Sequence, residues 1–200
     1  MRQIKITLLS VLLFSIAAPA DAYRVTFKEQ FYRLFHRQLV EAPNNIMENI
    51  FWLEMALRAD FANPLHALAR IETETEWEKY KNLFNMHLNL KMVEQYLLLG
   101  NMWNKRRAYF FNAPWRRQNL ESLDIAENLF RTALYYWEAA KYWAERANDR
   151  RFRFINLERV QFWEDSARRI ETGRLNYERT INRHLASLQR VREAFLAMPE

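Results

Sequence analysis

Apolar residues recur every three or four positions along nearly the whole chain after Tyr23, and no stretch alternates apolar and polar residues for long. A spacing of three to four residues is typical of one face of a helix, whereas alternation would indicate a β-strand. The first such face carries four large side chains, each four residues after the last: Phe27, Phe31, Phe35 and Leu39. The pattern therefore predicts an all-α fold.

Capping residues and prolines divide this pattern into separate helices. Residues 26–29 form a capping box at the start of the first predicted helix, which ends at Pro43. Asn45, with Glu48 three residues later, begins a second helix that extends to about Asp60. Two of the predicted helices are therefore short and lie near the N-terminus.

Further signals predict the remaining helices. Asn63 followed by Pro64 predicts the start of a third helix, and a capping box at residues 75–78 predicts a break before a long helix to about Phe111. Residues 112–117 read as a loop, and later helices are expected at residues 120–147, 152–170 and 174–197. We expect an antiparallel helical array of six to eight helices in a single domain, residues 23–200.

The N-terminus has the composition of a secretory signal peptide. Arg2 and Lys5 precede a mostly apolar run at residues 6–18, and small residues flank a cleavage site after Ala22. The apolar run is shorter than the about 20 residues of a membrane-spanning helix, although an uncleaved anchor is the alternative. We expect residues 1–22 to be removed and the mature protein to be periplasmic, without a transmembrane segment.

Composition limits the partners. The chain has no cysteine, so packing of its aromatic residues, 15% of the total, must replace disulfides. Its formal net charge of +6 is compatible with nucleic acid, an anionic membrane surface or an acidic protein. The predicted export of the protein argues against nucleic acid as its partner. Because basic and acidic residues look mixed in every segment, we interpret the charges as solvated helix faces.

One of only two glycines, Gly100, stands inside the apolar run at residues 95–103. Tyr96, Leu99, Gly100 and Trp103 resemble the first helix of a tetratricopeptide repeat, in which a small residue lets a neighbouring helix approach closely. The likeness implies that Gly100 lies at a helix crossing, where close packing offsets the cost of a glycine inside a helix.

Two other segments resemble the second helix of such a repeat. Ala126, Phe130 and Ala133 have its spacing of small and aromatic residues, and residues 53–64 resemble its end and following turn. The segment between Trp103 and Ala126 is longer than a 34-residue repeat allows. The fold is therefore either an irregular, expanded tetratricopeptide-like array or an ordinary irregular helix bundle.

No complete catalytic or metal-binding motif is present. The four histidines are far apart, Glu-x-x-His and His-Glu-x-x-His do not occur, and neither a cysteine nucleophile nor a Gly-x-Ser-x-Gly turn exists. A phosphate-binding loop would need glycines that the chain lacks. We assign no catalytic, metal-binding or cofactor-binding residue, and we expect no cofactor.

An acidic stretch at residues 69–77 supports the alternative, an enzyme. Glu72 and Glu74 lie near a predicted helix end, where they resemble the general-acid glutamate of lytic transglycosylases and goose-type lysozymes. The likeness implies a cell-wall glycan-cleaving enzyme. The glycine-rich cleft segment of that family is missing, however, and glutamates four residues apart are typical of a solvated helix start.

Aromatic and arginine residues supply the candidate partner-binding surfaces, because these residue types dominate binding energy at interfaces. On a helix, Tyr135, Tyr142 and Trp143 share one side. Tyr136 and Trp137 point elsewhere, so this helix is either buried nearly all round or presents an apolar patch. The candidate residues lie in the predicted loop and in this helix: Trp115, Arg116, Arg117, Tyr135, Tyr136, Trp137, Tyr142 and Trp143.

We therefore expect a non-catalytic periplasmic protein that binds other proteins as a scaffold module of a larger envelope assembly. Its size, export signal and helical repeat character look similar to the small periplasmic collar proteins of spirochaete flagellar motors. This likeness implies envelope or flagellar proteins as partners. The glycan-cleaving enzyme is the alternative.

Overall fold

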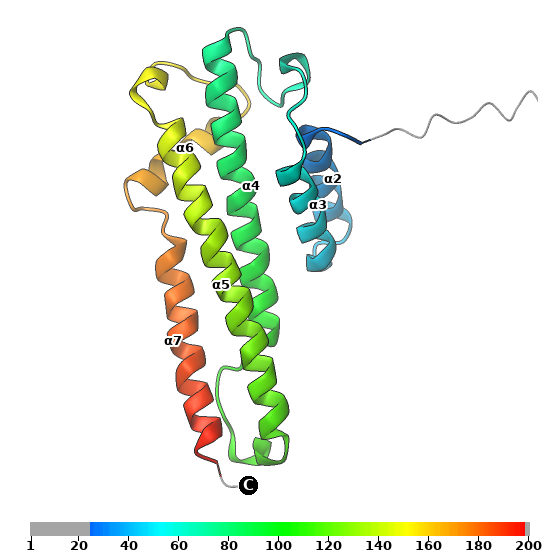
Figure 1. The fold of residues 1–200 in the computed structure, drawn as a ribbon, viewed down its shortest axis with the longest axis vertical. Coiled ribbons are helices and arrows are strands. Elements are labelled where there is room, and N and C mark those ends of the chain that lie inside the picture. Colours follow the sequence, from blue (N-terminus) through cyan, green and yellow to red (C-terminus); the bar gives the residue numbers. More distant parts are fainter. Residues whose placement is uncertain (1–24, 199–200) are drawn as a thin grey trace, which may run out of the picture.

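The computed structural model describes residues 25–198, which fold into six α-helices and three short 3-10 helices without a β-strand (Figure 1). The all-α prediction is confirmed for this part of the chain. The predicted signal peptide and its cleavage site after Ala22 lie outside the described residues. Between residues 25 and 198, no helix combines the length and the apolar character needed to cross a bilayer.

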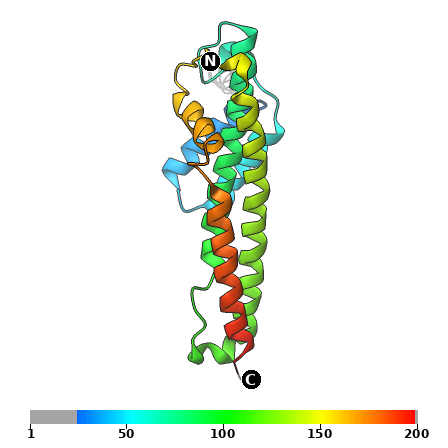
Figure 2. The same cartoon turned by 90° about the vertical axis from the view of Figure 1, so that its left-hand side faces the viewer.

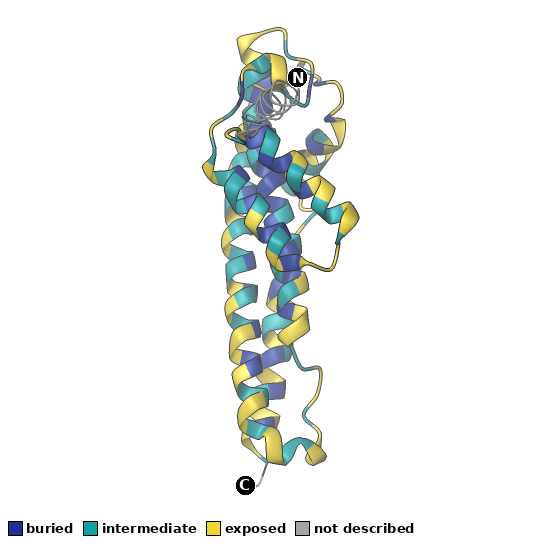
Figure 3. Cartoon of the chain, turned by 90° about the vertical axis from the view of Figure 1, so that its right-hand side faces the viewer, coloured by how far each residue is buried: buried dark blue, intermediate teal, exposed yellow. Residues whose placement is uncertain are grey.

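Two long antiparallel helices, α4 (Glu74–Trp103) and α5 (Arg116–Ala147), form the axis of an elongated molecule (Figure 1). α7 (Tyr177–Leu196) runs antiparallel to α5 toward the end of the molecule that carries the C-terminus (Figure 2). α6 (Gln161–Glu171) packs against α4 and α5 nearer the other end. Exposed residues dominate the outside of the C-terminal end (Figure 3).

The first two helices, α2 (Lys28–Glu41) and α3 (Ile46–Arg58), form a hairpin beside the N-terminal half of α4 (Figure 1). The buried Lys28 ammonium joins them, because its Nζ donates to the carbonyls of Ala56 at 2.8 Å and Leu57 at 3.0 Å. These carbonyls belong to the last turn of α3, where helical partners run out. A cation there also complements the negative end of the helix dipole.

Aromatic rings fill the core where α2, α4 and α6 meet. Phe84 and Trp163 stack with ring centroids 5.1 Å apart, and Tyr32 meets Phe84 edge-on at 5.2 Å. All three rings are buried. Stacked and edge-on aromatic pairs add to the free energy gained by burial, so aromatic packing anchors α6 and the hairpin to α4.

Gly100 lies where α4 packs against α5, as its resemblance to a repeat helix predicts. A β-carbon at Gly100 would lie 2.5 Å from Cε1 of Phe130, closer than real β-carbons approach. Phe130 is fully buried, as are Ala126 and Ala133 on the same face of α5. The predicted close helix contact is confirmed, and two of the three segments that resemble repeat helices, those around Gly100 and Phe130, face each other.

The predicted capping box at residues 26–29 is wrong. Gln30 caps α2 instead, because its Oε1 accepts the backbone N–H groups of Thr26 at 2.9 Å and Phe27 at 3.0 Å. Glu29 turns into the core, where its Oε2 accepts the N–H of Ala62 at 2.9 Å. A long-range hydrogen bond therefore takes the residue that the local pattern assigned to the cap.

The second capping box lies two residues earlier than predicted, at Thr73 and Glu76. The Thr73 hydroxyl accepts the N–H of Glu76 at 3.2 Å, and the Glu76 carboxylate accepts the N–H of Thr73 at 3.0 Å. The expected third helix at Pro64 is only one 3-10 turn, η1 (Pro64–His66). The chain leaves the helical path there, and the N–H of Leu68 donates to the Tyr80 hydroxyl at 3.1 Å.

α4 ends at Trp103, well before the predicted end at Phe111. The Trp103 carbonyl accepts a hydrogen bond from the Ser122 hydroxyl at 2.6 Å, which satisfies one of the last carbonyls of the helix. A 3-10 segment, η2 (Phe110–Trp115), leads into α5, which begins at Arg116. Arg116 and Arg117 are therefore helical, and the prediction of a loop at both residues is wrong.

The last two helices start later than predicted. η3 (Arg150–Phe152) is followed by irregular backbone up to α6. Side chains from other parts of the chain hold this backbone in place. The Nζ of Lys79 donates to the carbonyl of Ile155 at 2.5 Å. α7 begins at Tyr177, where the Asn176 side chain caps the helix by accepting the N–H of Arg179 at 3.0 Å.

Candidate functional site

Aromatic side chains on the outer face of α5 line a groove of about 330 Å³ whose other wall is α3. We call it the aromatic groove. Tyr135 is 69% exposed in it, and exposed Tyr and Trp beside Arg are typical of binding hot spots. The groove is lined by eight residues: Glu54, Leu57, Arg58, Asn89, Tyr135, Tyr136, Ala139 and Trp143.

The inner part of the groove is held in place by ring packing. Tyr136 stacks on Tyr96 of α4 with centroids 5.5 Å apart. Burial raises the pKa of Tyr136 to about 12. A wall fixed in this way loses little conformational freedom when a partner binds.

Tyr142 lies just beyond the groove, next to Trp143. The two rings meet edge-on at 5.0 Å, and the Arg146 guanidinium lies 5.5 Å from the Tyr142 centroid and 5.9 Å from that of Trp143. Arg146 also donates to the Tyr142 hydroxyl at 3.2 Å. These contacts extend the aromatic surface along α5.

Two of the candidate residues on this helix differ from prediction. Trp137 is only 2% exposed and packs edge-on against Tyr177 of α7 at 5.7 Å, so it belongs to the core and cannot contact a partner. Tyr136 shares the groove with Trp143, because residues seven apart on a helix lie on nearly the same side. The prediction that Tyr136 points away from Trp143 is therefore wrong.

The other candidates lie at the C-terminal end of the molecule, outside the groove. Trp115 is exposed at the end of η2. The Arg116 guanidinium donates to the carbonyl of Met198 at 2.8 Å, so it ties α5 to the end of the chain. Arg117 is exposed and pairs with Glu121 at 3.6 Å. The structure thus separates these three residues from the aromatic groove.

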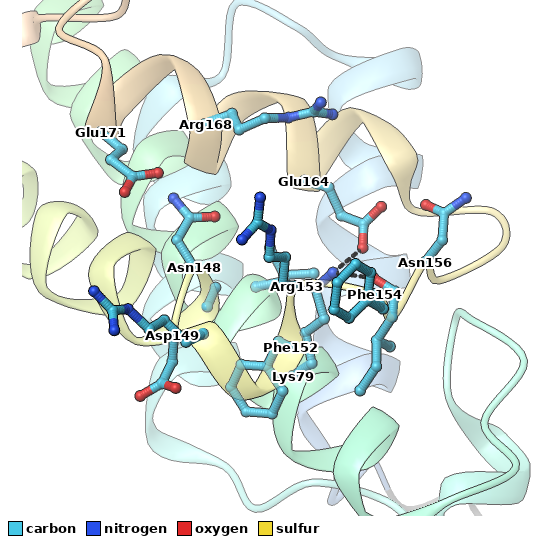
Figure 4. A pocket seen from close by; sticks show the side chains of 14 residues that line it. Lys79, Asn148, Asp149, Phe152, Arg153, Phe154, Asn156, Glu164, Arg168 and Glu171 are labelled. Carbon is cyan, nitrogen blue, oxygen red and sulfur yellow. Dashed lines mark hydrogen bonds and ion pairs between the residues drawn. The ribbon is translucent and has the colours of Figure 1, made fainter.

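A cavity of about 460 Å³ lies between α6 and η3 (Figure 4). Lys79 and Glu164 form an ion pair at 2.5 Å at one side of it, with side chains only 10% and 11% exposed. Glu164 also accepts the N–H of Leu157 at 3.3 Å. This pair fastens the backbone before α6 to α4, which is a structural task.

A chain of hydrogen bonds links α2 to α4. The Tyr32 hydroxyl lies 2.7 Å from Nε2 of His87 and 2.8 Å from Nε2 of His36. Burial holds the pKa of His87 well below its ordinary value and also lowers that of His36. Both imidazoles are therefore neutral near pH 7. His87 is buried and His36 is exposed, so this polar network runs from the core to the surface, where its three residues line a pocket of about 350 Å³.

The glutamates that suggested an enzyme lie at the surface. Glu72 and Glu74 are exposed, and Glu72 pairs with Arg70 at 2.7 Å. An apolar pocket, which would raise the pKa of a general acid, does not surround either carboxylate. Within residues 25–198, no three His, Cys, Asp or Glu side chains gather in an arrangement that could hold a metal ion.

Comparison with known proteins identifies a family without a known function. Neither the curated proteins nor the solved structures include a match to this chain. A family described as a domain of unknown function, DUF8513, matches residues 75–198. The match extends from the first turn of α4 to the end of the described chain, so it includes α5 but excludes α2 and α3. The chain therefore belongs to the DUF8513 family.

Proposed function

We propose that this protein is a non-catalytic scaffold of the bacterial cell envelope that binds another protein through the aromatic groove. The observation that carries the proposal is the meeting of Tyr135, Trp143 and Arg58 in one solvent-open groove between two helices. These residue types dominate the binding energy of protein interfaces, and truncation of such a residue typically costs about 2 kcal/mol or more. A helical or extended segment of a partner would fit between α3 and α5.

The groove combines aromatic and aliphatic side chains with a charged edge. Glu54 and Arg58 form an ion pair at 3.4 Å, and the Arg58 side chain is exposed. Interfaces commonly surround buried aromatic contacts with such a polar rim, which adds selectivity. Because α3 lies outside the family match, the rim belongs to this chain's own N-terminal hairpin rather than to the DUF8513 unit.

The proposal includes a repeat-like architecture. The contact between Gly100 and Phe130 supports an expanded tetratricopeptide-like unit built from α4 and α5. These helices contain 30 and 32 residues, so together they exceed a 34-residue repeat. The unit would therefore be an elongated relative of the standard repeat, and helical repeats commonly act as binding scaffolds.

The proposed location is the periplasm, after removal of residues 1–22. The composition of that segment supports export. The proposed partners are envelope or flagellar proteins, and the collar of a flagellar motor is the specific assembly that the sequence likeness suggests. Nucleic acid is not a proposed partner.

A photo-crosslinking amino acid placed at position 135 in the producing cells tests the proposal. We expect it to capture a defined protein, and we expect Arg58→Glu to abolish that product because it reverses a charge at the rim. The matched control places the same crosslinker at Phe154, which is 94% exposed and outside the groove. Identical products from both positions would contradict a binding site in the groove.

A further inference from the structure

Exposed aromatic residues cluster at one end of the molecule. This end carries the C-terminus (Figure 1). We call residues 102–117 the tip. Phe110 is 86% exposed, which is unusual for so large an apolar side chain. Six large apolar residues of the tip are exposed: Met102, Trp103, Tyr109, Phe110, Phe111 and Trp115. An exposed cluster of this kind marks an interaction surface.

The rings of the tip pack on one another. Tyr109 and Phe111 stack with centroids 5.1 Å apart, and Phe110 meets Phe111 edge-on at 5.6 Å. The backbone N–H of Asn112 donates to the carbonyl of Tyr109 at 2.9 Å, which closes the 3-10 turn that presents the rings. The cluster is therefore arranged before any partner arrives.

Basic residues flank these rings in the sequence. The sequence contains no Asp or Glu between Glu94 and Glu121, so the expectation that charges are mixed in every segment is wrong here. Glu121 is the nearest following carboxylate, and it lies 3.6 Å from Arg117 in an exposed pair. The tip contributes five positive charges: Lys105, Arg106, Arg107, Arg116 and Arg117.

The shape of the tip indicates the kind of surface that it fits. α5 begins and α7 ends there, and the connecting segment 104–115 runs from the end of α4 to the extremity of the molecule (Figures 1 and 2). A protruding apolar cluster at the end of a long molecule can meet a broad surface without obstruction by the rest of the chain. This geometry suits a lipid bilayer, which deforms around inserted side chains.

We propose that the tip docks the protein on an anionic lipid surface. Aromatic rings favour the boundary between lipid headgroups and acyl chains, where Trp and Tyr are enriched in membrane proteins. Lys and Arg beside them attract anionic phosphates. The aromatic groove lies on another part of α5, so this proposal is independent of the groove's partner.

Co-sedimentation with lipid vesicles tests this proposal, using purified residues 23–200, which contain every described helix but not the apolar run at residues 6–18. We expect binding to vesicles that contain phosphatidylglycerol and little binding to pure phosphatidylcholine. Replacement of Phe110 and Phe111 by serine, and separately Arg106 and Arg107 by glutamate, should each weaken binding on the order of tenfold.

Phe154→Ser is the matched control, because it removes an equally exposed phenylalanine elsewhere and should leave vesicle binding unchanged. Circular dichroism should show that all variants keep the helical fold. Equal binding to both kinds of vesicle, or tip variants that bind as well as the control, would overturn the proposal. Loss of a protein crosslink in the tip variants with unchanged vesicle binding would identify the tip as a protein-binding surface instead.

Discussion

The ring of Phe130 in α5 occupies the space that a side chain at Gly100 in α4 would need. Glycine inside a helix costs roughly 0.5–1 kcal/mol relative to alanine, so its presence there needs a compensating contact. The close approach of the two longest helices supplies that contact. The same contact holds together α4 and α5, the helices next to the aromatic groove and the tip.

The variant Gly100→Leu should be less stable, because the larger side chain must displace a fully buried ring. We expect a loss of about 1–3 kcal/mol in the free energy of unfolding. Urea denaturation followed by circular dichroism measures this change. An unchanged or raised stability would show that the position tolerates a side chain.

The matched control for Gly100→Leu removes the ring of Phe130. Phe130→Ala alone should destabilise by about 3–5 kcal/mol because it leaves a cavity. In the double variant, the leucine at position 100 should fill part of that cavity, so the combined loss should be smaller than the sum of the two single losses. Strict additivity would contradict direct contact between the two residues.

Removal of the ion pair between Lys79 and Glu164 should destabilise the end of the molecule near α6. Lys79→Met leaves a carboxylate that is only 11% exposed without its cation, so we expect a loss of about 3–5 kcal/mol. When Glu164 is also replaced by leucine in the Lys79→Met variant, much of the lost stability should be recovered. Arg168→Met breaks the exposed pair with Asp165 and should cost no more than about 1 kcal/mol.

Acid should weaken the fold partly through His87. Burial lowers the pKa of His87 in the folded chain below its ordinary value, so at pH values between the two the unfolded chain binds more protons. Stability should therefore fall as the pH drops below about 6.5, until the folded pKa is reached. His87→Gln should reduce the slope of stability against pH between 8 and 5, measured by urea denaturation, and an unchanged slope would contradict this role.

The helical class is predictable because it depends on local spacing, and the close helix contact at Gly100 is what the resemblance to a repeat helix implies. Several helix boundaries are not predictable, because side chains distant in sequence decide them. Glu29 reaches Ala62, and Lys79 reaches the backbone at Ile155, so neither residue follows its local pattern. A single sequence does not show such long-range hydrogen bonds.

The candidate surfaces, like the helix boundaries, are only partly predictable from the sequence. Tyr135 and Trp143 were identified from composition, whereas the burial of Trp137 depends on α7, whose position the sequence does not show. The sequence predicts only part of the tip, through Trp115, Arg116 and Arg117. The segment between Glu94 and Glu121 contains no carboxylate, which is visible in the sequence, but the local pattern predicts a helix over one part of it and a loop over another.

The glycan-cleaving alternative predicts an activity that the proposed scaffold lacks. In a gel that contains peptidoglycan, we expect the wild-type protein, Glu72→Gln and Glu74→Gln to give no cleared band. The reason is that both carboxylates are exposed, without the apolar surroundings of a general acid. A cleared band that disappears in either variant would establish the enzyme instead.

The affinity of the purified protein for the partner captured at position 135 tests the central claim most directly. Tyr135→Ala should weaken this affinity about 30-fold or more, as expected when a hot-spot residue worth about 2 kcal/mol is removed. Phe154→Ala, which removes an exposed ring outside the groove, should leave the affinity unchanged. Equal affinities for the wild-type protein and Tyr135→Ala would contradict binding through the aromatic groove.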